Sequence, residues 1–272
     1  MKLIGLVHLH STHSYDGKLS LSEIRDLAVR DGISFVCMTE HTEGMDEEKM
    51  QKFIDECRSV SDDRVSFIPG FEITSGNSHT LAIGVSSPVQ IGIPIEMMKK
   101  AKADGAWIVL AHPHRNQFEI QDAHLAVLDG IEIWNGQYDG KHVPRTAAVS
   151  YLSFLRRKLP KLLASAGLDL HRASHWGGPR IHLDIESVGA QASPRPVSSI
   201  VTGLKMGKFE IVRGSVHIPS DRPMPTVQRT MYAVSSAIRV GLIRMGKWVS
   251  STASHAGLQL PKTLKENIRR WM

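Results

Sequence analysis

Short apolar runs alternate with amphipathic stretches along the first two thirds of the chain. The runs at residues 3–7, 33–39 and 106–111 are almost continuously apolar, which is typical of strands buried on both faces. Between the first two runs, Ser20 and Glu23 have the spacing of a capping box, so a helix is expected to begin there. Strand and helix signals that alternate in this way favour an α/β fold built on a parallel sheet.

The same pattern predicts the remaining elements. Further strands are expected at 65–68, 79–85, 131–134, 162–168 and 209–213, and helices at about 46–60, 94–104, 143–158 and 200–206. The pattern weakens after Gly178, and Pro219, Pro223 and Pro225 mark a linker. A last helix is expected at 226–249, because apolar residues recur there at helical spacing: Val227, Met231, Val234, Ile238, Leu242, Met245 and Trp248.

Side chains of metal-ligand type follow the predicted strands. His8 and His10 close the first apolar run and point to the same face of a strand, because side chains alternate there. Only a barrel brings the C-terminal ends of many strands together, whereas an open sheet collects ligands at one switch point. The sequence therefore predicts a barrel with a shared site. The candidate ligands are His8, His10, Asp16, His41, Glu72, His79, His112, Asp169 and His171.

The chemistry of these residues indicates a cluster of cations. Histidine and carboxylate ligands without cysteine suit zinc, iron or manganese. Nine candidates are too many for one tetrahedral ion, so two or three ions are expected, with a carboxylate such as Glu72 bridging a pair. Each motif alone has an ordinary alternative, such as a packed histidine pair or a helix cap. Their shared position relative to the strands favours a metal cluster, which suits phosphoester hydrolysis.

The positive charge of the chain is unevenly distributed. The net charge is +6, yet residues 222–272 hold nine Lys/Arg and one acid, so the remainder is slightly negative. The basic helix expected in this segment has three interpretations. Its apolar stripe packs on the barrel while its charged face is solvated, or the helix binds an anionic membrane surface, or it contacts nucleic acid. Aromatic residues are too scattered there to support base stacking.

Length and cysteine content limit the class of protein. A chain of 272 residues can bury one large α/β domain with an appendage. The sequence contains only Cys37 and Cys57, so no disulfide framework is expected. We expect no removable signal peptide and no membrane-spanning segment, and a reducing cytoplasmic location. The oligomeric state is not predicted.

Several motifs together resemble one known family. The motifs are His8-Leu9-His10-Ser11, Tyr15-Asp16-Gly17, Thr39-Glu40-His41, Pro69-Gly70-Phe71-Glu72-Ile73, His79, Ala111-His112-Pro113 and Gly167-Leu168-Asp169-Leu170-His171. In this order they resemble the PHP (polymerase and histidinol phosphatase) superfamily over about residues 1–210. The resemblance implies a distorted (β/α)7 barrel with a trinuclear metal site. We accordingly expect a barrel domain at 1–215 and a basic, mainly helical extension at 216–272.

The resemblance also implies how the ligands are shared. His8, His10, Glu72 and Asp169 would hold one ion, Glu72, His79 and His112 a second, and Asp16, His41 and His171 a third. Two features depart from the family. Glu40 stands where the family usually has aspartate, and the short stretch between His112 and Asp169 lacks the insertion of the nucleoside-monophosphate phosphatase branch.

The function expected from these motifs is hydrolysis of the phosphate ester of a small metabolite. A nuclease or a phosphotyrosine phosphatase using the same site is the alternative, and a non-catalytic binding module is a third hypothesis. Arg115 and His171 are the residues predicted to act on the substrate. A guanidinium can bind phosphate through two parallel hydrogen bonds, although Arg115 could equally be a surface arginine. Arg172 and Asn135 are similar cases beside the site.

Overall fold

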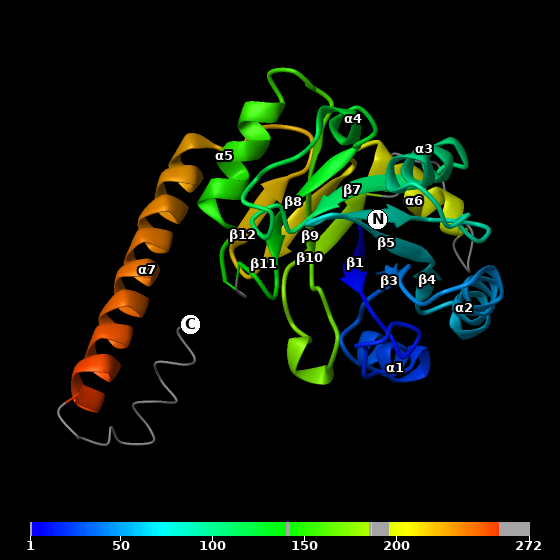
Figure 1. Cartoon of the computed structure of the whole chain (residues 1–272), viewed down its shortest axis with the longest axis horizontal. Helices are drawn as coiled ribbons and strands as arrows, with labels where there is room; N and C mark the ends of the chain where they lie inside the picture. The colour runs from blue at the N-terminus through cyan, green and yellow to red at the C-terminus, as the bar shows by residue number, and fades with distance from the viewer. Residues whose placement is uncertain (1, 140–141, 185, 187–195, 256–272) are drawn as a thin grey trace. The chain divides into compact units, whose positions relative to one another are not determined.

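The computed structural model describes residues 2–139, 142–184, 186 and 196–255. Within them, the strands form two six-stranded sheets with helices around them (Figure 1). The first sheet has the order β12 (Val216–Pro219), β11 (Phe209–Arg213), β10 (Arg180–Asp184), β1 (Lys2–Leu9), β2 (Phe35–Met38) and β4 (Ser66–Ile68). The second has the order β3 (Glu40–His41), β5 (Gly70–Ser75), β6 (Ser78–Ile83), β7 (Trp107–Ala111), β8 (Gly130–Asn135) and β9 (Leu163–Gly167).

The helices follow the expected positions closely. They are α1 (Leu21–Arg30), α2 (Glu47–Val60), α3 (Pro94–Ala103), α4 (Asp122–Leu125), α5 (Thr146–Leu155), α6 (Val197–Lys205), α7 (Thr226–His255) and a 3-10 turn at Ala173–His175. The predicted capping box is confirmed, since the Ser20 side chain accepts from the Glu23 amide while the Glu23 carboxylate accepts from the Ser20 amide. Helix α5 is shorter at both ends than the expected 143–158.

The predicted α/β class is confirmed, but a purely parallel sheet was the wrong expectation. Strand β6 runs antiparallel to both β5 and β7, and β10, β11 and β12 add to β1 in antiparallel order. Only Gly76 and Asn77 separate β5 from β6. A crossover between parallel strands needs a dozen or more residues, so this short turn can only produce a hairpin. Gly76 adopts the positive φ of 59° that such a turn requires.

Continuous chain and backbone hydrogen bonds join the two sheets. Thr39 alone lies between β2 and β3, and Pro69 alone between β4 and β5. On the other side, the amide of Leu168 donates to the carbonyl of Val7 at 2.8 Å, and the amide of His10 donates to the carbonyl of Leu170 at 2.9 Å. The structure therefore has two joined mixed sheets and does not confirm the expected (β/α)7 barrel. The C-terminal ends of β1, β3, β7 and β9 nevertheless lie near one another.

The core between sheets and helices is aromatic and aliphatic. Its largest fully buried side chains include Trp107, Trp134, Phe35, Phe53 and Phe71. Both cysteines are free and buried, in agreement with the absence of a disulfide framework. Polar side chains, including the candidate ligands, lie at one edge of the strands, outside this apolar core.

The chain divides into two compact units after Pro223. We expected the extension to begin at 216, but β12 pairs with β11 and completes the first sheet, so this segment belongs to the first unit. The described part of the second unit is dominated by α7, and the expected helix at 226–249 extends to His255. Residues 256–272 of the predicted extension lie outside the described residues. No described helix is long and apolar enough to cross a membrane.

Candidate metal centre

The nine candidate ligands come together at one edge of the strands. His8 and His10 lie at the end of β1, His41 ends β3, and His112 directly follows β7. Asp169 and His171 follow β9, while Glu72 lies within β5. His79 lies at the start of β6, as the predicted strand at 79–85 implies, although the candidate ligands were expected to follow strands. Because β6 is antiparallel, its start lies at the same edge, where His79 pairs with Ala111 of β7.

The backbone is unusual at three of these ligands. His8, His112 and Asp169 have φ values of 65°, 27° and 53°, in the region that residues other than glycine rarely adopt. The register between β1 and β2 shifts between Val7 and Leu9, so His8 occupies a bulge. Such strain persists only where surrounding structure enforces it, and it is concentrated at functional sites. The bulge still lets the two histidines face the same carboxylate, with Leu9 fully buried behind them.

Glu72 lies at the centre of the cluster, and its two oxygens face different imidazoles. Oε2 lies 3.2 Å from Nε2 of both His8 and His10. Oε1 lies 2.5 Å from Nδ1 of His79 and 3.1 Å from Nε2 of His112. The carboxylate thus separates two groups of nitrogen donors, which is the arrangement of a ligand that can serve two cations.

The remaining ligands lie on either side of His10. The carboxylate of Asp169 is 3.6 Å from Nε2 of His8 and 3.8 Å from Nε2 of His10. His10 stacks between the imidazoles of His41 and His171, at centroid distances of 4.4 and 4.3 Å. Asp16 closes this side, with an oxygen 3.1 Å from Nε2 of His171 and another 3.6 Å from Nε2 of His41.

The residues present fit divalent metal ions. Ligand atoms about 2.1 Å from a tetrahedral zinc ion lie about 3.4 Å from one another, close to the separations in this cluster. Four groups of three ligands have donor atoms within 4.8 Å of one another; they are His8/His10/Glu72, His8/His112/Asp169, Glu72/His79/His112 and His10/His41/His171. Among the described residues, Nε2 of His10, Nδ1 of His41 and Oδ1 of Asp16 are buried without a hydrogen-bond partner. Buried polar atoms are normally paired, so these three are available to a cation.

At His10, His41 and Glu72 the pKa shifts favour the forms that bind metal. Burial lowers the pKa of His10 to about 4 and also lowers the pKa of His41, which leaves neutral imidazoles with free lone pairs. Burial alone would raise the pKa of Glu72, but the facing imidazoles, His8 first, hold it well below its usual value. His8 itself has a raised pKa, because the neighbouring carboxylates, Glu132 first, outweigh its burial. A cation at Nε2 would take the place of that proton.

One buried carboxylate that the sequence interpretation missed is Glu132. Its Oε1 accepts from Nδ1 of His8 at 2.8 Å, and its Oε2 accepts from the backbone amide of His112 at 2.8 Å. It therefore orients one ligand and fixes the backbone of another. Gly167 makes room for it, because a Cβ there would lie 2.0 Å from Glu132 Oε1. The sequence did contain an indication of this residue, because Glu132 stands between Ile131 and Ile133 in a mostly apolar strand.

Glu40, where the family usually has aspartate, lies behind the cluster and supports its loop. It accepts from the amide of Ser11 at 2.9 Å, from Ser11 Oγ at 2.7 Å and from Ser14 Oγ at 2.5 Å. Ser14 Oγ in turn accepts from the amide of His41 at 3.0 Å. Burial raises the pKa of Glu40, although these hydrogen bonds oppose the shift. The longer side chain thus anchors the turn after His10.

A cavity of about 410 Å³ opens beside the cluster. It is lined by Asp16, Lys18, Gln137, Tyr138, Asp169, His171, Arg172 and His175. Its volume is in the range of pockets for small molecules. Arg172 lines this cavity, while Arg115 lies on the other side of the cluster with Nη1 3.4 Å from Nε2 of His79. Asn135 is buried behind the site, and its amide donates to Glu132 at 3.1 Å.

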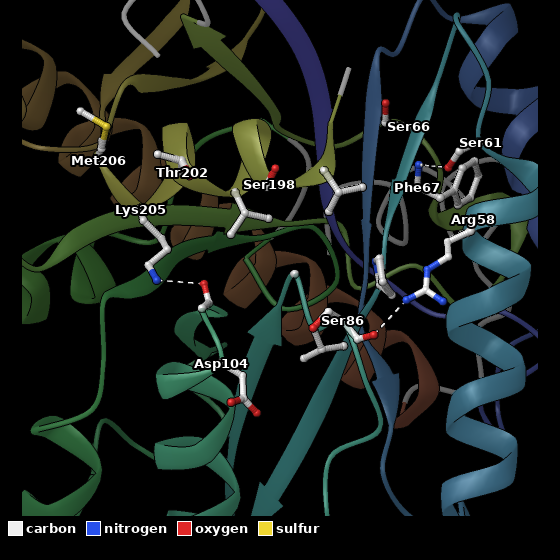
Figure 2. A pocket seen from close by; sticks show the side chains of 16 residues that line it. Arg58, Ser61, Ser66, Phe67, Ser86, Asp104, Ser198, Thr202, Lys205 and Met206 are labelled. Carbon is white, nitrogen blue, oxygen red and sulfur yellow. Dashed lines mark hydrogen bonds between the residues drawn. The ribbon is translucent and has the colours of Figure 1, made fainter. Parts of the chain in front are cut away.

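A larger cavity of about 850 Å³ lies at the opposite ends of the strands. Its lining includes Ser66, which begins β4, and Gly105, which precedes β7. Figure 2 shows Lys205 and Asp104 at one end of it and Arg58 at the other. The described residues that line it include no histidine and only one carboxylate, so they do not offer a set of metal ligands. The smaller cavity is therefore the candidate substrate pocket.

A family model matches the part of the chain that carries seven of the nine candidate ligands, all except Asp169 and His171. The model of the PHP domain matches residues 7–164, more than half of the chain, so the chain belongs to the PHP domain family. A search of the curated proteins finds no match to this chain.

One solved structure shares the fold at low sequence identity, and two others are less similar. One is a two-domain protein from Bacteroides vulgatus containing a predicted PHP-like metal-dependent phosphoesterase, with a TM-score of 0.60, 19% identity and coverage of 80% of this chain and 66% of that protein. A putative metal-dependent phosphoesterase from Bifidobacterium adolescentis gives a TM-score of 0.47 and 16% identity over 64% of this chain and 90% of that one. An amidohydrolase from Chromobacterium violaceum, crystallised with sulfate and no metal, gives a TM-score of 0.47 and 16% identity. The match covers 65% of this chain and 90% of that one. The chain thus spans just under two thirds of the length of the Bacteroides protein.

Proposed function

We propose that the chain is a multinuclear metal-dependent phosphoesterase that hydrolyses the phosphate ester of a small metabolite. The observation that carries the proposal is the position of Glu72 within one buried cluster. Its Oε2 faces the imidazoles of His8, His10 and His41, whereas its Oε1 faces those of His79 and His112. A carboxylate so placed can join two cations, and a set of adjacent cations suits the charge of a phosphoryl group better than that of a neutral substrate.

The proposed centre would hold three ions, two of which share Glu72. His8, His10, Glu72 and Asp169 would hold the first, Glu72, His79 and His112 the second, and Asp16, His41 and His171 the third. Zinc, manganese or iron is the expected occupant, since the ligands are imidazoles and carboxylates. When bound, such ions lower the pKa of a water and stabilise the leaving oxygen.

The side chains around the centre would bind and orient the substrate. Arg115 is exposed next to His79, so its guanidinium is free to donate to phosphoryl oxygens. Lys18 and Arg172 line the cavity beside the cluster and add positive charge at its rim. His171 also lines this cavity. With 19% of its side chain exposed, it is the most accessible of the proposed histidine ligands. The cavity volume of about 410 Å³ favours a small ester.

Chelation and metal replacement test the proposal directly. The full chain would be stripped with a chelator, reloaded separately with Mn²⁺, Zn²⁺ or Fe²⁺, and assayed on p-nitrophenyl phosphate. We expect activity to vanish on chelation and to return with at least one metal. Phosphotyrosine peptide, single-stranded DNA and RNA would be assayed in parallel. If no ester were hydrolysed with any of the three metals, the proposal would be contradicted. Preferential cleavage of nucleic acid would contradict the proposal of a small substrate.

Replacing Arg115 tests its role in substrate binding. In Arg115→Ala we expect kcat/KM on p-nitrophenyl phosphate to fall about 10- to 100-fold, because a hydrogen bond to a charged group contributes about 1.5–3 kcal/mol. The loss should appear mainly in KM, and metal content should be unchanged. Arg64→Ala is the matched control, since Arg64 is an exposed arginine that pairs with Asp62. Unchanged KM in Arg115→Ala would show that Arg115 is only a surface residue.

A further inference from the structure

Helix α7 has an exposed apolar stripe along its length. Six large apolar side chains on it are more than half exposed; they are Val227, Met231, Val234, Ile238, Met245 and Trp248. Their separations of three, four and seven residues place them on one side of a helix with 3.6 residues per turn. Exposed apolar patches of this kind mark surfaces that bind a partner or a membrane.

The charge of this helix is of one sign. Between 226 and 255 the sequence contains three arginines and one lysine and no acid, and Arg229 and Arg244 are exposed. The whole of 222–272 holds nine Lys/Arg against one acid, whereas the rest of the chain is slightly negative. A stripe of apolar residues combined with basic residues and no acids is typical of a helix that lies in the interface of an anionic bilayer.

We propose that α7 docks on the surface of an anionic phospholipid bilayer, with its axis in the membrane plane. The stripe would enter the boundary between headgroups and acyl chains, and the cations would contact lipid phosphates, each contributing about 1 kcal/mol. Trp248 belongs to a residue type that prefers this boundary.

Two other binding partners, a second copy of α7 and nucleic acid, fit the surface of this helix less well. Pairing with α7 of a second copy would bring together two helices that carry cations and no acids, which repel each other. Binding to nucleic acid would use the cations but leave the apolar stripe in water. The proposal is independent of the phosphoesterase reaction, because it concerns only the surface of α7.

Vesicle flotation of the full chain tests the proposal. Vesicles of phosphatidylcholine alone would be compared with vesicles containing about a third of phosphatidylglycerol at low and high salt. We expect flotation only with the anionic vesicles and a decrease at high salt, where the cations are screened. The double variant Met231→Asp with Ile238→Asp should lower partitioning at least about tenfold, because two charges would enter the apolar boundary. The double variant Met231→Leu with Ile238→Leu is the matched control and should float like the original chain.

A charge variant and a solution measurement complete the test. Arg229→Glu with Arg244→Glu should also lower flotation. Metal content and turnover of p-nitrophenyl phosphate should be unchanged in every variant, which shows that the first unit is folded. Three results would overturn the proposal: no flotation with anionic vesicles at low salt, binding of duplex DNA that the aspartate variant retains, or a dimer in solution that the aspartate variant abolishes.

Discussion

In Glu72→Gln we expect metal content to fall by at least one ion per chain and turnover to fall about a thousandfold. The amide of glutamine keeps the size of the side chain but offers only one weak oxygen ligand and no charge. Both groups of imidazoles on either side of residue 72 would therefore lose their common anionic partner. Because metal ions supply several kcal/mol of transition-state stabilisation, and each 1.4 kcal/mol is a factor of ten, the loss should be large.

Elemental analysis and steady-state kinetics would measure these two quantities on the same preparation. Glu96→Gln is the matched control, because Glu96 is an exposed carboxylate on α3 that pairs only with Lys99 on the surface. Circular dichroism would verify that the variant is folded. If Glu72→Gln retained its full metal content and its turnover, the bridging role proposed for this carboxylate would be wrong.

A second large effect is expected at Glu132, which touches no substrate and acts through His8. In Glu132→Gln the imidazole of His8 loses a charged acceptor at 2.8 Å, so its orientation and basicity both change. Loss of such an outer partner typically lowers metal affinity or activity about 10- to 100-fold. We therefore expect weaker metal binding that is restored in part by excess metal.

The rescue by metal distinguishes a positioning role from a purely structural one. Titration of stripped Glu132→Gln with Mn²⁺ or Zn²⁺ should show a shifted midpoint and a kcat that recovers toward the original value at saturation. Glu132→Asp should retain more affinity than Glu132→Gln if the charge is what matters. A variant that is unfolded, or whose kcat stays low at saturating metal with an unshifted midpoint, would contradict this account.

The sequence predicted that these histidines and carboxylates would lie together, because side chains alternate regularly along a strand. His8 and His10 had to share a face, and ligands that follow parallel strands had to lie at one edge. His79 reached the same edge for a different reason, since the apolar pattern of 79–85 indicates a strand but not its direction. The two-residue turn at Gly76 and Asn77 makes β6 antiparallel to β5, and the sequence prediction did not take this turn into account.

The supporting side chains could not be predicted as easily. Glu132 lies in a strand whose pattern favours burial, and the sequence does not indicate which distant backbone amide a buried acid will contact. Glu40 was expected only as a departure from the family, whereas the structure shows it holding Ser11 and Ser14. Strand β12 was also missed, because Val216–Pro219 is short and ends in proline next to the predicted linker.

The β5–β6 hairpin limits how this part of the chain can change. Glu72 and His79 are carried by one hairpin, so their relative position depends on the length of a single turn. Adding one residue would shift the pairing and turn one of the two side chains to the opposite face of the sheet. Insertions should therefore accumulate in other loops of active homologues, while this turn keeps its length even where its residues differ.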